Sequence, residues 1–480
     1  MAKRVATIDI GSNSTRLIIY ERSSRFAFRV LYETKSRVRV SEGAYSNNSY
    51  LQEKPMQRTL DALCDFSNII NSFGARKTLC VATSALRDAP NRTEFIKQVK
   101  DKTGISIKVI DGQKEAYLGA LACTSLLPEQ DSAITLDIGG GSCELAIIEQ
   151  ESIKHQLSLS LGSVRLKELY LDKNDIEGAK KYINSELESL GDVFSSKTLI
   201  GIGGTFRAIS LLLLKDSPLK KLHGFSPSTE KFTNLLESII VADEAKLKKI
   251  GISKSRLDVI KAGALILHSI IKKLGVSKLI TSGVGVREGL FLKDLLRNQH
   301  DKFPHNFNPS IRYIQDRFIL NKTHANQMFN LSKKIFELTH SDLNIDKSHL
   351  YELSVAAKIG DASQYIKHSL DDSYAPLIVE ELLEYRFTHE QVALISTICS
   401  YANYKRLKKL LPSKEIVEYL SYVLKITSAL LLHHPKNIDF EIELIGKVLV
   451  VSKKTSSHLV SEMIEDIKDK NIFDVKISTP

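Results

Sequence analysis

The chain has 480 residues and a formal net charge of +11, with 43% hydrophobic and 26% charged residues. This length predicts two to four domains, and the composition is that of a globular protein rather than a disordered chain. No apolar run reaches the roughly 18 residues of a membrane span, so no membrane association is expected. The five cysteines lack CxxC spacing, which argues against a zinc site or a disulfide framework.

The first 300 residues alternate short apolar or β-branched runs with helical patterns. The runs predict strands at residues 5–10, 17–20, 78–82, 105–110, 133–138, 144–148, 199–202 and 279–281. Apolar residues at steps of three and four between Met56 and Ile70 predict one face of a helix. This alternation predicts an α/β fold.

From about residue 304 the strand-like runs disappear, and helical patterns such as that of residues 325–338 follow. An apolar run at 444–451 and a helical pattern at 457–468 predict a small strand–helix appendage at the C-terminal end. We therefore expect four domains, at residues 1–120, 121–303, 304–435 and 436–480.

An internal repeat is the clearest organisational feature. Residues 7–21 return at a fixed offset as residues 135–149, and both copies begin Thr-x-Asp-Ile-Gly-x-x-Ser. Chance apolar alternation would not reproduce an aspartate, a glycine and a serine in the same frame. Each copy predicts strand, glycine turn, strand, so the repeat indicates two homologous halves that face one another.

The two glycine turns have the composition of phosphate cradles, because glycine lets backbone N–H groups approach an anion and hydroxyls add donors. Each turn follows an aspartate at a strand end, Asp9 or Asp137, and a carboxylate beside a phosphate implies a cation between them, usually Mg²⁺. The alternative is a pair of hairpin turns with no ligand, which two matched copies disfavour. The candidate phosphate-binding residues are Gly11, Ser12, Asn13, Ser14, Gly139, Gly140, Gly141 and Ser142.

Two further glycine clusters, at residues 199–207 and 281–289, each follow an apolar run and precede a helical pattern. Such a junction aims N–H groups and a helix dipole at an anion, so Gly203, Gly204 and Thr205 join the candidates. Neither cluster matches a Walker A loop or completes a dinucleotide-binding fingerprint.

Six motifs follow one another in this region: Asp9-Ile-Gly-Ser-Asn-Ser, Thr83-Ser-Ala-Leu-Arg-Asp88, Asp111-Gly-Gln-Lys-Glu-Ala116, Asp137-Ile-Gly-Gly-Gly-Ser-Cys-Glu144, Gly201-Ile-Gly-Gly-Thr205 and Ser282-Gly-Val-Gly-Val-Arg-Glu-Gly289. In this order they resemble the exopolyphosphatase / guanosine pentaphosphate phosphatase family, which belongs to the actin, sugar kinase and heat-shock chaperone superfamily. The resemblance covers about residues 4–300. It implies two ribonuclease-H-like, actin-type domains that enclose a phosphate cleft.

The resemblance also assigns catalytic roles. Glu115 matches the family's catalytic glutamate, which would orient and deprotonate the attacking water. Arg87 matches the family's phosphate-contacting arginine, whose planar fork can hold two oxygens. Lys114 departs from the pair of adjacent glutamates that some members carry, which puts fine tuning of the site in doubt.

Further acidic positions match the metal site of the family. Asp137 and Glu144 match acidic positions that in the family lie near the metal and the water, and Asp9 is the equivalent aspartate of the first copy. Glu144 occupies the place that Arg16 holds in the first half, so one half could offer a cation to the phosphate chain and the other a carboxylate to Mg²⁺. Arg16 is therefore a candidate phosphate-binding residue.

For the C-terminal half the resemblance implies a helical domain similar to the HD metal phosphohydrolases. His324 could stand for its first histidine, but Gly360 falls where the histidine of the His-Asp pair would be. We expect a degenerate, HD-like domain without a metal, in which His368, His433 and His434 are ordinary surface or core residues.

The predicted protein is a cytoplasmic, Mg²⁺-dependent exopolyphosphatase that also converts guanosine pentaphosphate to the tetraphosphate. The expected partners are these phosphates, with a second copy of the chain as a further candidate. Nucleic acid is less favoured, because the chain has no tryptophan, basic run of five or RNA-binding signature. Three alternatives stay open: a phosphatase mainly of guanosine pentaphosphate, a kinase of the same superfamily, and a non-catalytic polyphosphate or alarmone sensor.

Overall fold

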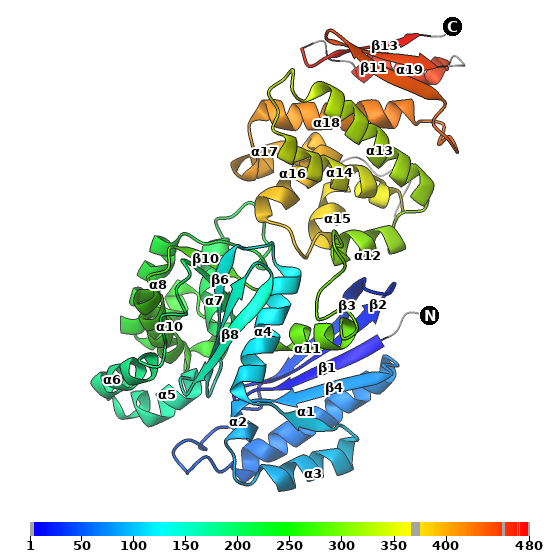
Figure 1. Cartoon of the computed structure of the whole chain (residues 1–480). Helices are drawn as coiled ribbons and strands as arrows, with labels where there is room; N and C mark the ends of the chain where they lie inside the picture. The colour runs from blue at the N-terminus through cyan, green and yellow to red at the C-terminus, as the bar shows by residue number, and fades with distance from the viewer. Residues whose placement is uncertain (1–3, 366–374, 454–456, 468, 470, 479–480) are drawn as a thin grey trace. The chain divides into compact units, whose positions relative to one another are not determined.

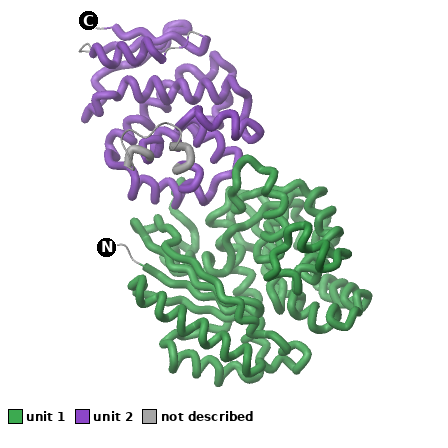
Figure 2. Tube along the Cα trace, turned by 180° about the vertical axis from the view of Figure 1, so that it is seen from behind, with its two compact units in different colours: residues 1–307 green, residues 308–480 purple. Residues whose placement is uncertain are grey.

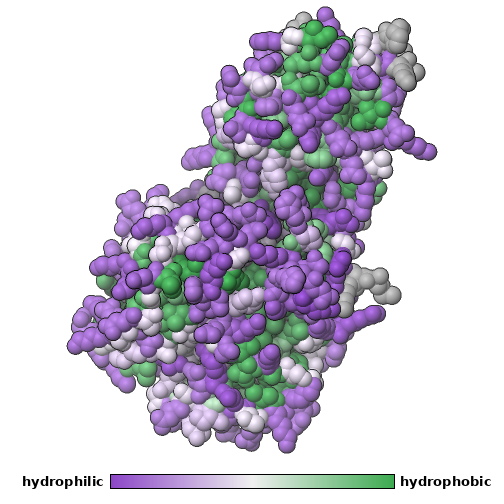
Figure 3. Space-filling view, in the orientation of Figure 1, coloured by the Kyte–Doolittle hydropathy of each residue, from purple (hydrophilic) through white to green (hydrophobic). Residues whose placement is uncertain are grey.

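The computed structural model describes residues 4–365, 375–453, 457–467, 469 and 471–478 (Figure 1). The chain divides into two compact units, Met1–Phe307 and Asn308–Pro480, against an expected boundary at residue 304 (Figure 2). On the face drawn in Figure 3, hydrophilic side chains cover most of the surface and hydrophobic ones gather in separate groups. Among the described residues, no helix is both long and apolar enough to cross a membrane.

The first unit contains two five-stranded sheets. The first has the order β3-β2-β1-β4-β5 and the second the order β10-β9-β6-β7-β8. Each of the eight predicted runs coincides with a strand to within a few residues. The strands are β1 (Arg4–Ile10), β2 (Thr15–Arg22), β3 (Phe28–Ser36), β4 (Lys77–Ala82), β5 (Ile107–Val109), β6 (Ser132–Ile138), β7 (Cys143–Glu149), β8 (Ser152–Leu159), β9 (Thr198–Ile202) and β10 (Lys278–Thr281).

The two sheets repeat one another, as the sequence repeat predicts. Read from the edge strand inward, β3-β2-β1-β4-β5 corresponds to β8-β7-β6-β9-β10, with antiparallel hairpins first and parallel strands after them. The same irregularity also occurs in both sheets. The register of the β2–β3 pair shifts between Ile19 and Tyr20, and the register of the β7–β8 pair shifts at the equivalent place, between Ala146 and Ile148. This shared topology confirms the two homologous halves.

The sequence prediction missed β3 and β8. Both are edge strands of their sheets, and most of their residues are only partly buried. An edge strand needs no continuous apolar run, because solvent covers part of it. β8, with Lys154 and His155 at its centre, therefore carries no strand signal of the kind that a buried strand shows.

Helices cover the outer faces of both sheets. On the first sheet α1 packs with the predicted face, since Leu60, Leu63, Phe66 and Ile70 are all buried in its core. The helices of this unit are α1 (Glu53–Ser72), α2 (Ser84–Arg87), α3 (Arg92–Thr103), α4 (Gly112–Leu126), α5 (Ser163–Leu169), α6 (Ile176–Leu187), α7 (Gly203–Leu214), α8 (Thr229–Val241), α9 (Glu244–Ile250), α10 (Ile260–Leu274) and α11 (Val286–Leu295).

Two of these helices cross between the halves. α4 follows the first sheet but packs on β6, β7 and β8 of the second, whereas α11 follows the second sheet and packs on β1 of the first. The two helices also pack against each other, and Leu118 and Val286 share a small core with Val81 and Ile110. The expected boundary at residue 120 falls inside α4, because this helix follows the first sheet in the chain but packs on the second.

The second unit begins with helices and ends with a small sheet of order β11-β12-β13. The run at 444–451 was predicted as one strand, which is wrong: it is divided between β11 and β12, because Gly446 adopts a φ of 59° in a turn. The predicted helix at 457–468 is confirmed as α19, and β13 was not foreseen. The elements are α12 (Pro309–Arg317), α13 (Lys322–Thr339), α14 (Leu350–Ile359), α15 (Ala375–Leu382), α16 (His389–Cys399), α17 (Tyr404–Leu407), α18 (Lys414–Leu430), β11 (Phe440–Ile445), β12 (Val448–Lys453), α19 (His458–Ile467) and β13 (Asp474–Ser478).

The histidine of the proposed HD-like domain lies in the first turn of α13. The His324 ring contacts the His434 ring in a tilted arrangement, with 3.9 Å between ring centres, and its Nε2 is 3.6 Å from Asp361. Burial lowers the pKa of His324, Asp361 opposes that shift and His434 adds to it. His368 lies outside the described residues. The HD-like assignment stays a prediction.

The contact between α4 and α11 generates a stability prediction. A Cβ on Gly289 would lie 1.9 Å from the Leu118 carbonyl oxygen, so Gly289→Ala must push the two helices apart. Overpacking of this kind costs about 1–3 kcal/mol of unfolding free energy. Gly191→Ala is the control, because its Cβ would meet nothing within 4 Å. Thermal unfolding should place Gly289→Ala clearly below both the wild type and the control; equal midpoints would contradict this packing.

Candidate active site

The first glycine turn joins β1 to β2. The Gly11 N–H donates to the Ser14 carbonyl at 3.2 Å, which closes the turn. The register of the hairpin sets Asp9 directly opposite Arg16, so the strand ends present one acidic and one basic side chain beside the turn.

The second glycine turn joins β6 to β7 in the same way. The Gly139 N–H donates to the Ser142 carbonyl at 2.9 Å, and Asp137 lies opposite Glu144. The repeat thus places two carboxylates here where the first half has a carboxylate and a guanidinium, as the sequence comparison of the two copies predicts.

A third glycine segment begins α7, whose first residues face the same cleft. Gly203 adopts a φ of 78°, and a Cβ there would lie 2.3 Å from Asp137 Oδ1. Glycine therefore lets this backbone approach the aspartate closely. The N-terminus of α7 adds backbone donors and the positive end of a helix dipole to the cleft.

Arg87 and Glu115 form an ion pair with 3.0 Å between Nη1 and Oε2. Glu115 lies in the first turn of α4, where the Asp111 side chain caps the helix by accepting from the Lys114 N–H at 2.7 Å. Arg87 ends α2 and also donates to Ser142 Oγ at 3.3 Å. The arginine of the first half thus reaches the glycine turn of the second.

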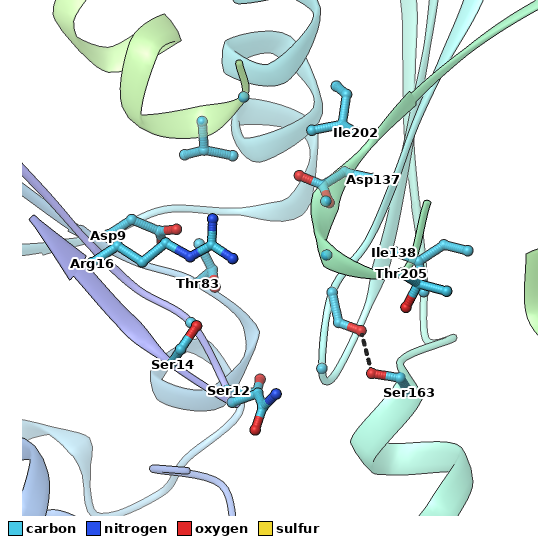
Figure 4. A pocket seen from close by; sticks show the side chains of 18 of the residues that line it. Asp9, Ser12, Ser14, Arg16, Thr83, Asp137, Ile138, Ser163, Ile202 and Thr205 are labelled. Atoms are coloured by element: carbon cyan, nitrogen blue, oxygen red, sulfur yellow. Dashed lines mark hydrogen bonds between the residues drawn. The ribbon is translucent and has the colours of Figure 1, made fainter. Parts of the chain in front are cut away.

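These segments enclose a cleft of about 920 Å³, counting its open mouth. In Figure 4 Asp9 and Arg16 lie on one wall and Asp137 on the other. Arg87, Gly141, Ser142 and Glu144 are not among the described residues that line it. The predicted residues on its lining are Asp9, Gly11, Ser12, Asn13, Ser14, Arg16, Glu115, Asp137, Gly139, Gly140, Gly203, Gly204 and Thr205.

Four cations of the cleft were missed: Lys35, Arg207, Arg256 and Arg287. Arg207 donates to the Ser282 and Val284 carbonyls at 2.7 and 2.9 Å. Arg207 and Arg287 stand inside motifs that the sequence analysis had singled out, so the motifs could have revealed them. Nothing near Lys35 or Arg256 in the sequence marks them, since only the fold brings them to the cleft.

Arg287 is almost fully buried and pairs with Glu33 at 2.6 Å. Burial lowers its pKa, but the neighbouring Glu288 and Glu33 outweigh that effect and raise it. Burial lowers the pKa of Arg207 to about 10, with Arg16 adding to the shift. The guanidinium groups thus crowd one another, as they would in a site built for a polyanion.

The carboxylates are crowded as well. Burial raises the pKa of Asp9 to about 6, against the opposing charges of Arg287 and Arg16, and burial also raises that of Asp137. The pKa of Glu144 rises to about 8, chiefly through burial. Burial, and then the charge of Glu144, raise the pKa of Glu115 well above its usual range. Acid groups this perturbed are typical of functional sites.

The acidic residues fit a divalent cation. Within the described part of the chain, Glu144 Oε2 is buried and has no hydrogen-bond partner. Among the described residues, however, no three histidine, cysteine or carboxylate side chains could hold a metal ion together. Mg²⁺ is commonly held by one or two carboxylates together with phosphate oxygens. Asp9 and Asp137 line the cleft and Glu144 lies opposite Asp137, so a cation that takes its remaining ligands from a bound phosphate would fit this donor set.

Two sheets of one topology, whose glycine turns meet at a cleft, define an actin-like α/β protein. The Ppx/GppA phosphatase family model matches residues 17–298, more than half of the chain. The chain therefore belongs to the Ppx/GppA phosphatase family, and membership of a phosphatase family makes it a hydrolase.

Curated relatives and solved structures agree with this family. A bifunctional 3-dehydroquinate synthase/phosphatase of Fusobacterium nucleatum is 33% identical over 58% of this chain, which spans only 44% of that protein. A guanosine-5'-triphosphate,3'-diphosphate pyrophosphatase of Aliivibrio fischeri is 25% identical over 92% of this chain and 88% of its own length.

The solved structure of an Aquifex aeolicus Ppx/GppA family member is 25% identical, with a TM-score of 0.54. The match covers 62% of this chain and 100% of that one. An exopolyphosphatase structure from Cytophaga hutchinsonii, at 23% identity and a TM-score of 0.57, covers 61% of this chain and 98% of its own and supports the fold alone.

The raised pKa of Glu144 predicts a pH effect on stability. Because the folded state holds this proton more tightly than the unfolded chain, the stability contribution is complete below pH 4.5 and falls as the pH rises to about 8. In a chelator, Glu144→Gln should therefore be more stable than the wild type at pH 8.5, by on the order of 2–4 kcal/mol, and should lose that advantage at pH 4.5.

The check is thermal unfolding at both pH values, with Glu149→Gln, an exposed residue of the same strand, as the control. Added Mg²⁺ should stabilise the wild type more than Glu144→Gln at pH 8.5. A Glu144→Gln curve that follows the wild type at both pH values would contradict a buried carboxylate whose pKa is raised, despite the hydrogen bond that Ser158 donates to its Oε1.

Proposed function

We propose that this chain removes terminal phosphates from linear phosphate chains, inorganic polyphosphate and the guanosine pentaphosphate 5′-chain, by attack of a water molecule on the last phosphorus. The observation that carries the proposal is the convergence of Glu115, paired with Arg87, on two matched glycine turns. The name of the Aliivibrio relative supports the substrate class.

Binding would rest on backbone donors and cations. The N–H groups of Gly11–Ser14, of Gly139 and Gly140, and of the α7 N-terminus, all on the cleft lining, would cradle the terminal phosphate. Arg16, Arg207, Arg256, Arg287 and Lys35, all on the cleft lining, would neutralise the following phosphates. The open mouth lets a longer chain extend out of the cleft.

Water activation would rest on Glu115. A base must stay close to the water yet be strong enough to take its proton, and a buried carboxylate with a raised pKa is a stronger base than an exposed one. Arg87, which pairs with Glu115 from behind the described lining of the cleft, would hold the Glu115 carboxylate in place. With its proton taken, the water attacks in line and the shorter phosphate chain leaves.

Mg²⁺ would be held by Asp137 and Glu144, with Asp9 nearby, and would supply positive charge to the phosphate oxygens. We therefore expect the reaction to require Mg²⁺. Its loading would also lower the pKa of the neighbouring carboxylates, which favours the ionised state that Glu115 needs.

The direct test measures orthophosphate release from long polyphosphate and from guanosine pentaphosphate, side by side, with Mg²⁺ and with a chelator. Release from at least one substrate that depends on Mg²⁺ supports the proposal. ATP with a small acceptor alcohol is the kinase control. Phosphate transfer to the acceptor without release to water would overturn the proposal.

A salt series tests the cationic lining. If several guanidinium groups contact a long chain, salt must compete with each contact, so KM for polyphosphate should rise steeply with KCl. Guanosine pentaphosphate makes fewer such contacts and should respond less. Equal salt dependence of the two KM values would argue against an extended cationic track.

The role of Glu115 makes the sharpest prediction for the reaction. Glu115→Gln keeps the size of the side chain but cannot take a proton, so kcat should fall by roughly 10²–10⁴-fold. Polyphosphate affinity should change little, because binding uses other groups. Steady-state kinetics and direct binding check this, with Glu94→Gln on exposed α3 as the control. A near-wild-type kcat would mean that another group activates the water.

A further inference from the structure

The groups of the proposed reaction come from both halves of the first unit. Arg87 and Glu115 belong to the first half, whereas Ser142 and Glu144 belong to the second. Their direct link, from Arg87 Nη2 to Ser142 Oγ, measures 3.3 Å, which is long for a hydrogen bond from a charged donor. The packing of α4 and α11 joins the two halves as a whole, but close to the reacting groups a further side chain also spans them.

Arg165 of α5 makes three such contacts. Its Nε donates to the Gly141 carbonyl at 2.7 Å, and its Nη2 donates to Asp88 Oδ2 at 2.6 Å. The face of its guanidinium lies over the Tyr45 ring, 4.6 Å from the ring centre. One side chain of the second half thus joins its own glycine turn to two segments of the first half.

The two first-half partners of Arg165, Asp88 and Tyr45, each contact a residue of the proposed site. Asp88 follows Arg87 in the chain and lies 3.8 Å from Arg87 Nε. The Tyr45 hydroxyl is 3.3 Å from Ser12 Oγ, on the first glycine turn, and Ser12 Oγ is 3.0 Å from Ser84 Oγ. Arg165 therefore contacts, directly or through one residue, both turns and the helix that carries Arg87.

The packing around these contacts is tight. A Cβ on Gly141 would lie 1.9 Å from the Tyr45 hydroxyl, so the second turn and Tyr45 touch without room for a side chain. The Arg165 side chain is 17% exposed. Neither Arg165, Asp88 nor Tyr45 is among the described residues that line the cleft, so none is placed to touch the substrate there.

We infer that Arg165 is a positioning residue: with Asp88, Tyr45 and the Gly141 carbonyl it forms a latch that holds the two half-sites in register. Arginine suits this role because its planar fork serves two acceptors while its face stacks on an aromatic ring, which a lysine cannot do. The inference rests on the proposed function, since it explains how Arg87 and Glu115 are kept opposite the second turn.

Kinetics of the full chain test the latch. Arg165→Gln should lower kcat on polyphosphate roughly 10- to 100-fold, because small misplacement of reacting groups is costly, while KM changes little. Arg165→Lys should recover part of that loss. Asp88→Asn should lower kcat too, and the double variant should lose less than the product of the two single losses. Lys167→Gln is the control: it removes a cation of the same helix whose partner, Asp172, lies in the same half.

Distances between the halves give a second readout that needs no activity. Spin labels on Lys97→Cys of α3 and Lys181→Cys of α6, both exposed, would report the separation of the halves, with the partly exposed Cys64 and Cys399 changed to serine. The wild type and Lys167→Gln should give one narrow distance distribution, and Arg165→Gln a broader or longer one.

Equal kcat values for Arg165→Gln and Lys167→Gln, or a loss confined to KM, would overturn the latch, as would unchanged distances. If the wild type releases no phosphate, the proposed function fails, and the distances alone decide whether Arg165 holds the halves together.

Discussion

The close contact of two glycine turns is the constraint on which the site depends. A Cβ on Gly140 would lie 2.6 Å from Ser12 Cβ, so the turn of one half packs directly on the turn of the other. This approach brings two sets of backbone donors to one place. It also brings together Asp9 and Asp137, which lie near the ends of β1 and β6, and leaves both carboxylates with little contact with solvent.

This arrangement buries several charged side chains close together, which shifts their pKa values. Three carboxylates with raised pKa values, Asp9, Glu115 and Asp137, line one cleft together with several arginines, and Glu144 lies opposite Asp137 in the adjoining strand. In the proposed function, a polyanion with its counter-cation would balance both sets of charge, because the phosphates would meet the arginines and the cation would meet the carboxylates. The acids and the arginines thus point to one kind of ligand.

The sequence predicts most strands of the first unit and about half of the residues that line the cleft. The repeat predicted both hairpins, because an aspartate, a glycine and a serine recur in one frame whatever the packing. Arg16 and Glu144 were found by the same comparison, and their cross-strand places opposite Asp9 and Asp137 follow from the hairpin register. The edge strands β3 and β8 were missed, since partial solvent exposure removes the apolar signal.

Other residues could not be found in the sequence because tertiary packing alone gives them a role. Lys35 and Arg256 stand in no motif, and Arg165 reaches Asp88 only because α5 packs beside the second turn. The exchange of α4 and α11 between the halves is likewise invisible in a local pattern, which is why a boundary drawn at residue 120 cut through α4.

The central claim is that water attacks the terminal phosphorus. Hydrolysis of polyphosphate in ¹⁸O-labelled water, followed by mass spectrometry of both products, tests it most directly. The account predicts one ¹⁸O in each released orthophosphate and none in the shortened chain. Label in the shortened chain, or release of unlabelled orthophosphate, would contradict it.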